Sequence, residues 1–302
     1  GGETRNLIEL VGKSASADLT IQLGSASYKA TYSVEFVASE ETVLADIDNR
    51  INAVIPQLNL EGTGISSITY ADKHAVFTIN DLNVDIINFA DSGILNLFLE
   101  MFKDVKTAEI NGQVINLEGM TAAELKTAVG QYLIYPLIEG GETRNLIELV
   151  GKSASADVTI QLGSASYKAS YSVDFVAATF NLTTAAENGN AEGAGVYAVG
   201  SEVTITATAA TDYAFFNWAD EAGNEVSTAN PYIFTMVNRD LTLTANFVKT
   251  EAAVLADVDS RIVDAIANLN LAGTGIIEVA YENRLATFLI DDAQESISAF
   301  AG

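Results

Sequence analysis

The chain is organised around a stretch that it contains twice. Residues 1–39 read GGETRNLIELVGKSASADLTIQLGSASYKATYSVEFVAS, and residues 140–178 repeat them 139 positions later. Of the 39 positions, 35 are identical, and the changes replace Leu19 by Val158, Thr31 by Ser170, Glu35 by Asp174 and Ser39 by Ala178. A repeat this close sets the architecture before any single motif does.

The duplicated stretch predicts two amphipathic strands. Leu19, Ile21 and Leu23 alternate with polar residues, which is the period of a half-buried strand. After a turn at residues 24–26 the alternation is clearer, and one face carries Tyr28, Ala30, Tyr32, Val34 and Phe36. Two of the four changes between the copies fall on the opposite, polar face. The aromatic face is therefore predicted to be packed.

A second block is duplicated at a different offset. Apolar residues at helical spacing between Val43 and Leu58 recur 211 positions later, between Val254 and Leu269. Each helix is followed by the residues GTGI and by a predicted hairpin, over 68–79 in the first copy and 279–290 in the second. Because this offset exceeds 139 by 72, the second copy holds an insertion between its strands and its helix, at residues 179–250.

These offsets predict an α+β fold made of two homologous α+β repeat units, with a small all-β domain inserted in the second. The predicted domains are repeat unit 1 at 1–91, a helical and hairpin extension or linker at 92–139, a discontinuous repeat unit 2 at 140–178 plus 251–302, and the inserted domain at 179–250. Within the extension we expect helices at 94–102 and 122–129 and a hairpin around 111–112.

The insertion has the pattern of an independent β domain. Val203, Ile205 and Ala207 alternate with threonines, as do Leu241, Leu243 and Ala245. The ordered combination of Gly200, an FxxW element at Phe215 and Trp218, the segment NPYIF from Asn230 and the closing ANF at 245–247 resembles the divergent InlB B-repeat module of bacterial surface and secreted proteins. The resemblance covers about 70 of the 302 residues and implies an extracellular stalk or interaction unit without catalytic residues.

The composition limits the partners. The chain has 15 basic and 40 acidic residues and a formal net charge of -25, which repels phosphate backbones, so neither nucleic acid nor an anionic membrane is expected as a partner. No apolar run approaches the roughly 20 residues that cross a bilayer. The absence of cysteine excludes thiolate catalysis, disulfides and cysteine-based metal sites.

Few residues suggest chemistry. His74 is the only histidine and its counterpart is Leu285, so we interpret it as a surface residue. Asp46 and Asp48, like Asp257 and Asp259, stand two apart on the polar side of the predicted helices, and we interpret them as solvated. The metal candidates are carboxylates after the hairpins that offer calcium its oxygen ligands: Asp81, Asp85, Asp291 and Asp292. No EF-hand spacing accompanies them, and no other cofactor is predicted.

The repeated tyrosines leave two interpretations open. Tyr28 and Tyr32, with Tyr167 and Tyr171, suit a platform on which a sugar stacks, or they are core residues. Their alternation with valine and phenylalanine on one face favours the core.

We therefore predict a non-enzymatic extracellular or cell-surface structural protein: a stalk, an adhesin segment or a self-assembling filament subunit. In the filament version a strand from one molecule completes an edge of the next, with residues 4–10 as the donor and Thr4, Leu7, Ile8 and Leu10 as assembly residues. The alternative is a module that binds a surface glycan or protein through Tyr197 and Asn224. A carboxylate-dependent hydrolase ranks last, because no pair of acids is marked by its context.

Overall fold

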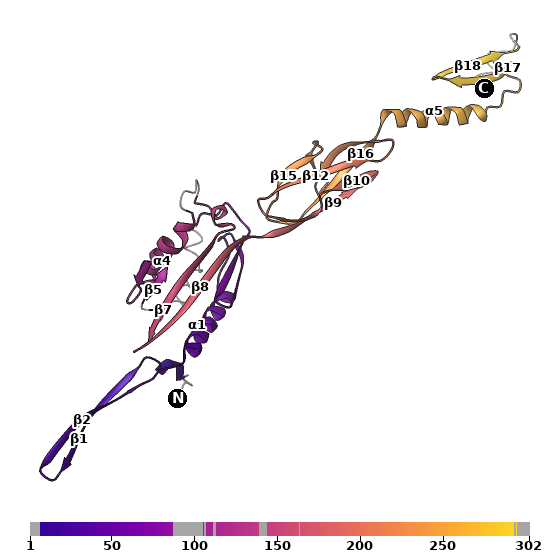
Figure 1. Cartoon of the computed structure of the whole chain (residues 1–302). Coiled ribbons are helices and arrows are strands. Elements are labelled where there is room, and N and C mark those ends of the chain that lie inside the picture. The colour runs from indigo at the N-terminus through magenta and orange to yellow at the C-terminus, as the bar shows by residue number, and fades with distance from the viewer. Residues whose placement is uncertain are drawn as a thin grey trace. The chain divides into compact units, whose positions relative to one another are not determined.

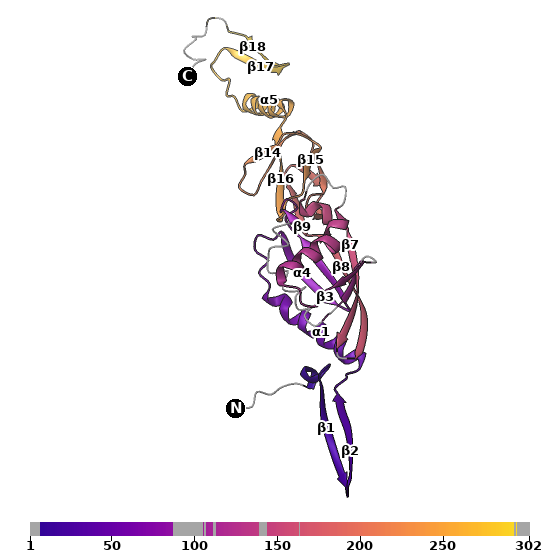
Figure 2. The ribbon, with the colours of Figure 1, turned by 90° about the vertical axis from the view of Figure 1, so that its left-hand side faces the viewer.

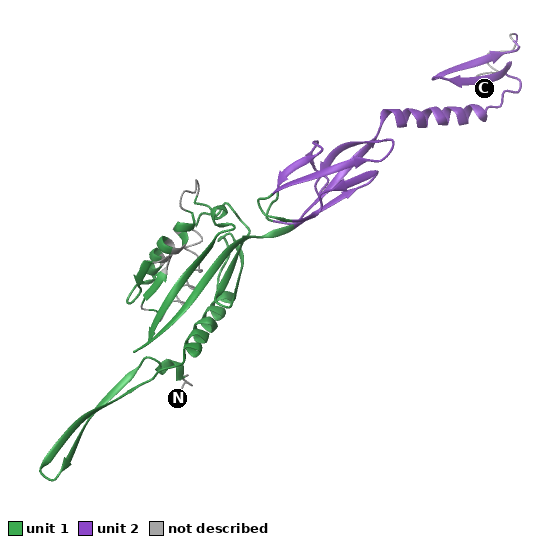
Figure 3. Ribbon diagram, viewed as in Figure 1, with its two compact units in different colours: residues 1–180, 197–201, 236–238 green, residues 181–196, 202–235, 239–302 purple. Residues whose placement is uncertain are grey.

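The computed structural model describes residues 7–86, 105, 107–110, 113–138, 144–162, 164–292 and 294. The described chain is mostly β, with the α-helices α1 (Glu40–Val54), α4 (Ala122–Val129) and α5 (Glu251–Ala267) among many strands (Figure 1). It divides into two compact units (Figure 3). Unit 1 comprises residues 1–180, 197–201 and 236–238, and unit 2 comprises residues 181–196, 202–235 and 239–302.

Unit 1 is built on a six-stranded sheet whose order is β3-β4-β8-β7-β5-β6. The strands are β3 (Ile65–Ala71), β4 (His74–Ile79), β5 (Thr107–Ile110), β6 (Gln113–Asn116), β7 (Ser153–Leu162) and β8 (Ala165–Ala177). Within this sheet β4 and β8 are parallel neighbours, with Phe77 opposite Phe175, and the other neighbours are antiparallel. Strands from both sequence copies therefore share one sheet.

Helix α1 begins at a cap and packs through one stripe. The Ser39 side chain accepts a hydrogen bond from the Thr42 backbone N–H, and Glu40 and Glu41 lie in the first turn, where the helix dipole favours acids. Val43, Ile47 and Ile51 are buried in the core cluster, together with Phe77, Ile79 and Phe175. Helix α1 and strand β8 lie side by side in both ribbon views (Figure 2).

The prediction of an α+β fold made of two repeat units was wrong. The described chain is mostly β, and its fold combines halves of the two sequence copies. The helix and hairpin of the first copy, α1, β3 and β4, form their core with the strands of the second copy, β7 and β8. The first copy's own strands, β1 (Ser14–Leu23) and β2 (Ala26–Glu35), form a separate two-stranded sheet. The second copy's α5 is followed by another two-stranded sheet, β17 (Ile276–Glu282) and β18 (Leu285–Ile290).

The described residues of the predicted extension belong to unit 1. Strand β5 pairs with β7, and Leu125 and Ala128 of α4 are buried. Short helices η3 (Gly130–Ile134) and η4 (Tyr135–Leu137) follow. The predicted helix at 94–102 and the turn at 111–112 lie outside the described residues.

Unit 2 contains most of the inserted β domain, as the alternation of Thr with apolar residues predicts. A five-stranded sheet has the order β11-β9-β16-β13-β14, and a three-stranded sheet has the order β10-β12-β15. The strands are β9 (Thr179–Ala186), β10 (Gly189–Glu192), β11 (Gly195–Ala198), β12 (Glu202–Ala209), β13 (Tyr213–Ala219), β14 (Glu225–Ser227), β15 (Tyr232–Thr235) and β16 (Leu241–Lys249). Trp218 is fully buried, and its ring lies 5.8 Å from that of Phe215.

Candidate functional site

In unit 1, the strands of the second sequence copy pack against the helix and hairpin of the first. Tyr167, Tyr171, Val173 and Phe175 of β8 are all buried, as the alternation predicts. The rings of Phe77 and Phe175 lie 5.4 Å apart. The Ser172 backbone N–H donates to the Lys73 carbonyl at 3.0 Å, so backbone and side chains both fix the docked position of β8.

A short segment before β7 closes this contact at one end. Leu146, in the short helix η5 (Leu146–Leu149), is fully buried, and its backbone N–H donates to the Val84 carbonyl at 2.9 Å. It packs against Gly64, where an added Cβ would lie 2.6 Å from Leu146 Cδ1. Gly64 has φ +75, so glycine serves here both for the turn and for the close approach of the leucine.

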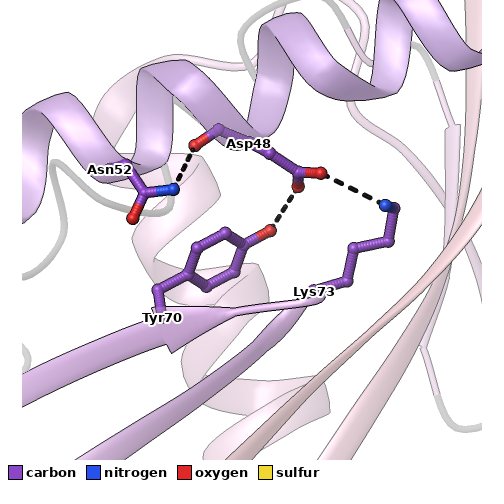
Figure 4. A network of polar contacts seen from close by, with 4 residues as sticks. All are labelled: Asp48, Asn52, Tyr70 and Lys73. Carbon is purple, nitrogen blue, oxygen red and sulfur yellow. Dashed lines mark hydrogen bonds and ion pairs between the residues drawn. The ribbon is translucent and has the colours of Figure 1, made fainter.

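Asp48 joins helix α1 to the β3–β4 hairpin, as Figure 4 shows. One carboxylate oxygen accepts a hydrogen bond from the Tyr70 hydroxyl, and the other lies 3.1 Å from Lys73 Nζ. Burial, and then the hydrogen bond to Asp48, raise the pKa of Tyr70 well above its ordinary value. The interpretation of Asp48 as a solvated residue therefore missed its structural role. The available signal was the tyrosine 22 positions on, which recurs at the same distance in the second copy.

The second copy repeats this network in α5, β17 and β18. The Tyr281 hydroxyl donates to Asp259 at 2.8 Å, and Arg284 Nε lies 3.3 Å from the same carboxylate. Both hairpins turn through two residues of positive φ, Asn283 and Arg284 here and their counterparts in the first copy. A hollow of about 490 Å³ opens beside this network, and it is lined by Asp259, Ser260, Val263, Tyr281, Glu282, Asn283 and Arg284.

The counterparts of the buried contact are exposed. Phe36 of the first hairpin is 41% exposed, whereas the equivalent Phe175 is 1% exposed. Phe288 of β18 is 44% exposed, whereas the equivalent Phe77 is 2% exposed. Every described residue of β1, β2 and β18 is classed as exposed, and no residue of α5 is buried. The same apolar surfaces thus occur once packed and once open.

The predicted assembly residues lie beside the exposed hairpin. Leu7, Ile8 and Leu10 belong to the short helix η1 (Leu7–Leu10), and Thr4 lies outside the described residues. Leu7 is 82% exposed, although the equivalent Leu146 is 0% exposed. The β1–β2 hairpin was not predicted as an assembly element, because its alternation was interpreted as packing within its own unit.

The four acidic residues predicted as calcium ligands take part in local hydrogen bonds and backbone pairing. Asp81 accepts a hydrogen bond from the Asn83 N–H at 3.0 Å, and Asp292 accepts one from the Gln294 N–H at 2.9 Å. Asp85 forms a β-bridge with Asn145, and the Asp291 N–H donates to the Gly275 carbonyl. Within the described ranges, no three residues of the metal-binding types are grouped to hold a metal ion.

The predicted ligand residues occupy ordinary positions in the β domain. Tyr197 is half-buried on β11, and the Asn224 side chain and backbone donate to Asp220 within a tight turn. His74 is only partly exposed: its Nδ1 lies 2.8 Å from Ser172 Oγ and its Nε2 lies 3.3 Å from Asp174 Oδ2. The histidine therefore bridges β4 and β8.

The comparisons with known proteins concern the inserted module. None of the helices in the described parts of the chain has the length and apolar character of a membrane span. No curated protein matches this sequence. Residues 180–251 match the model of the divergent InlB B-repeat domain, which confirms the predicted resemblance and indicates a repeat module of the kind associated with bacterial surfaces.

Proposed function

We propose that the protein is a non-enzymatic structural protein of the bacterial surface that associates with itself, as the subunit of a filament or array. The observation that carries the proposal is the apolar face of the duplicated stretch, which is buried in the second copy and exposed in the first. Nearly identical sequences should have nearly identical packing preferences, so the exposed copy is an unfilled half of a contact that the chain already makes.

The two exposed parts are also poor folding units on their own. A two-stranded sheet is marginally stable in water unless further strands or a helix cover its apolar face. The β1–β2 hairpin exposes Leu19, Ile21, Tyr28, Tyr32, Val34 and Phe36. Exposed apolar surface of this extent marks an interaction site. A partner is needed to cover the apolar face of this hairpin, which supports association as the function of the protein.

Sedimentation velocity of the purified chain over a concentration series tests association. We expect the sedimentation coefficient to rise with concentration, with elongated particles in negative-stain electron microscopy. Because the net charge is -25, added salt should promote association by screening the repulsion between copies. A single monomeric species at every concentration and salt tested would contradict the proposal.

The surface location is tested separately. In the bacterium that makes the protein, antibodies against the β domain should label intact cells, and added protease should remove the signal without lysis. A signal that appears only after lysis would contradict an extracellular location, whatever the state of association.

A further inference from the structure

We propose that the partner is a second copy of the same chain, joined head to tail. The donor is the N-terminal hairpin, β1 and β2 with η1, and the acceptor is α5, β17 and β18 of the next copy. The joint reproduces the way in which η5, β7 and β8 dock on α1, β3 and β4. This inference rests on the proposed self-association and names its contact.

The donor is preformed in the required shape. The hairpins β1–β2 and β7–β8 pair in the same register, Ser14 with Glu35 in one and Ser153 with Asp174 in the other. The residues that β8 buries are unchanged in the first copy: tyrosine at 28 and 32 and valine at 34 in β2, and phenylalanine at 36 directly after it. Leu7 likewise repeats Leu146, the residue that packs against Gly64.

The acceptor keeps the chemistry of the first copy. Val254, Val258 and Ile262 of α5 stand where Val43, Ile47 and Ile51 of α1 are buried. Phe288 and Ile290 of β18 repeat Phe77 and Ile79. The hydrogen bond from Tyr281 to Asp259 holds the hairpin to the helix before any partner arrives. An acceptor that is organised in advance loses less conformational entropy on binding.

The docking of β8 on β4 within unit 1 is the template for the joint, and it gives the register. Because Phe77 lies opposite Phe175 and Thr78 opposite Val176, Phe36 of one copy should lie opposite Phe288 of the next, and Val37 opposite Leu289. The strand order at the joint would be β17-β18-β2-β1, which matches the β3-β4-β8-β7 part of the six-stranded sheet.

The joint differs from the template at one polar contact. Leu285 replaces His74, so the contact of His74 Nε2 with Asp174 Oδ2 has no counterpart there. This pair is half-exposed, and such pairs add little to affinity. The loss of this contact should therefore change the affinity of the joint little.

If the partner is a second copy, one unfilled donor hairpin and one unfilled acceptor remain in the resulting dimer, so further copies can add. When the hairpin of one copy fills the acceptor of another, each end of the pair still carries one free half, so the contact propagates. Closure of a hairpin on the acceptor of its own chain would use both halves and stop association.

Cysteine cross-linking between two variants tests the joint, because the natural chain has no cysteine. The variants are Val37→Cys and Leu289→Cys, whose template equivalents, Val176 and Thr78, are not buried, so neither substitution removes packing. Mixed and oxidised, they should give a disulfide-linked dimer, since opposed Cα atoms on neighbouring strands lie about 5 Å apart. A chain carrying Thr78→Cys and Val176→Cys calibrates the yield.

The register control is Val37→Cys mixed with Thr287→Cys. This pair is two residues out of register, about 8 Å between Cα atoms, which exceeds the reach of a disulfide. Dimers from the Thr287→Cys mixture in equal yield would overturn the proposal. So would a monomer-sized intrachain disulfide, with loss of association, in a chain carrying both Val37→Cys and Leu289→Cys.

Sedimentation of the same samples separates the two levels of failure. Association without the disulfide would overturn this joint and leave the proposed self-association standing. Absence of association would remove both. As a second measurement, Phe36→Asp should weaken association by about 100-fold or more, because it would bury an unpaired charge. Lys29→Ala, on the polar face, should leave association unchanged, and equal effects of the two substitutions would contradict the joint.

Discussion

Phe175 and Phe36 occupy the same place in two copies of one sequence, but the same substitution should cost much more stability at the buried site than at the exposed one. Phe175 is fully buried against Phe77, and truncating such a phenylalanine to alanine costs about 3–5 kcal/mol. For Phe36→Ala in the monomer we expect about 1 kcal/mol or less, because the side chain remains substantially exposed.

Differential scanning calorimetry of the full chain measures the difference. For a folded unit of 150–250 residues, 1 kcal/mol corresponds to about 2–4 °C, so Phe175→Ala should lower the Tm of unit 1 by about 6–20 °C. Phe36→Ala should lower it by about 4 °C at most. The scans should be run at a protein concentration at which sedimentation shows monomers, because association would bury Phe36.

The comparison is internally controlled, since the flanking residues of the two sites are nearly identical. Equal shifts in Tm from the two substitutions would refute the assignment of one hairpin to the core and the other to the surface. A larger shift from Phe36→Ala would reverse the roles of the hairpins.

Three further predictions concern single residues. The Tyr171 hydroxyl oxygen is buried without a hydrogen-bond partner among the described residues, and burial raises the pKa of this tyrosine. Unit 1 should therefore lose stability as the pH rises above about 10, where tyrosine ionises in the unfolded chain. Tyr171→Phe should reduce this loss in Tm at high pH and leave the stability at pH 7 unchanged or higher. Gly64→Ala should lower the Tm of unit 1 by more than Gly62→Ala does. Both glycines have positive φ, but only a Cβ added at position 64 would meet packed atoms. Equal shifts in Tm would show that the backbone conformation alone decides the cost. In the β domain, Asn217→Ala should lower the free energy of unfolding by about 1–2 kcal/mol, because the Asn217 side chain hydrogen-bonds Glu225 and Asn246. Urea unfolding measures this change through the fluorescence of Trp218, the only tryptophan. An unchanged unfolding midpoint would contradict a role for this network.

The local structure was largely predictable from the sequence. The helix that Ser39 caps, the hairpin at 68–79 and its repeat at 279–290, and the β domain all follow from periodicity and turn residues. These features depend on neighbours in the chain, so a local pattern is enough to indicate them.

The pairing of the two copies was not predictable in the same way. Residues 26–36 and 165–175 have almost the same sequence, so their patterns are equally compatible with α1 as a partner. The polar differences are small, since Glu35 stands in the first copy where Asp174 contacts His74 in the second. Residues 107–110 add a strand beside β7. Long-range contacts of this kind, rather than local propensity, decided that the copies exchange halves.

Asp48 illustrates a second limit. Its spacing from Asp46 indicated only that the two acids do not face each other on the helix, and did not indicate that Tyr70 and Lys73 reach it from the following hairpin. The recurrence of the arrangement at Asp259 shows that it is a feature of the repeat.

Hydrogen exchange of the two hairpins as a function of concentration tests the central claim most directly. Peptides from residues 26–36 and 165–175 differ in mass at two positions, so both are followed in one sample. The residues 165–175 should be protected at every concentration, whereas residues 26–36 should exchange fast in dilute solution and become protected as the concentration rises. Residues 26–36 that remain unprotected in samples where sedimentation shows association would contradict the claim that the exposed hairpin and the buried one make the same contact.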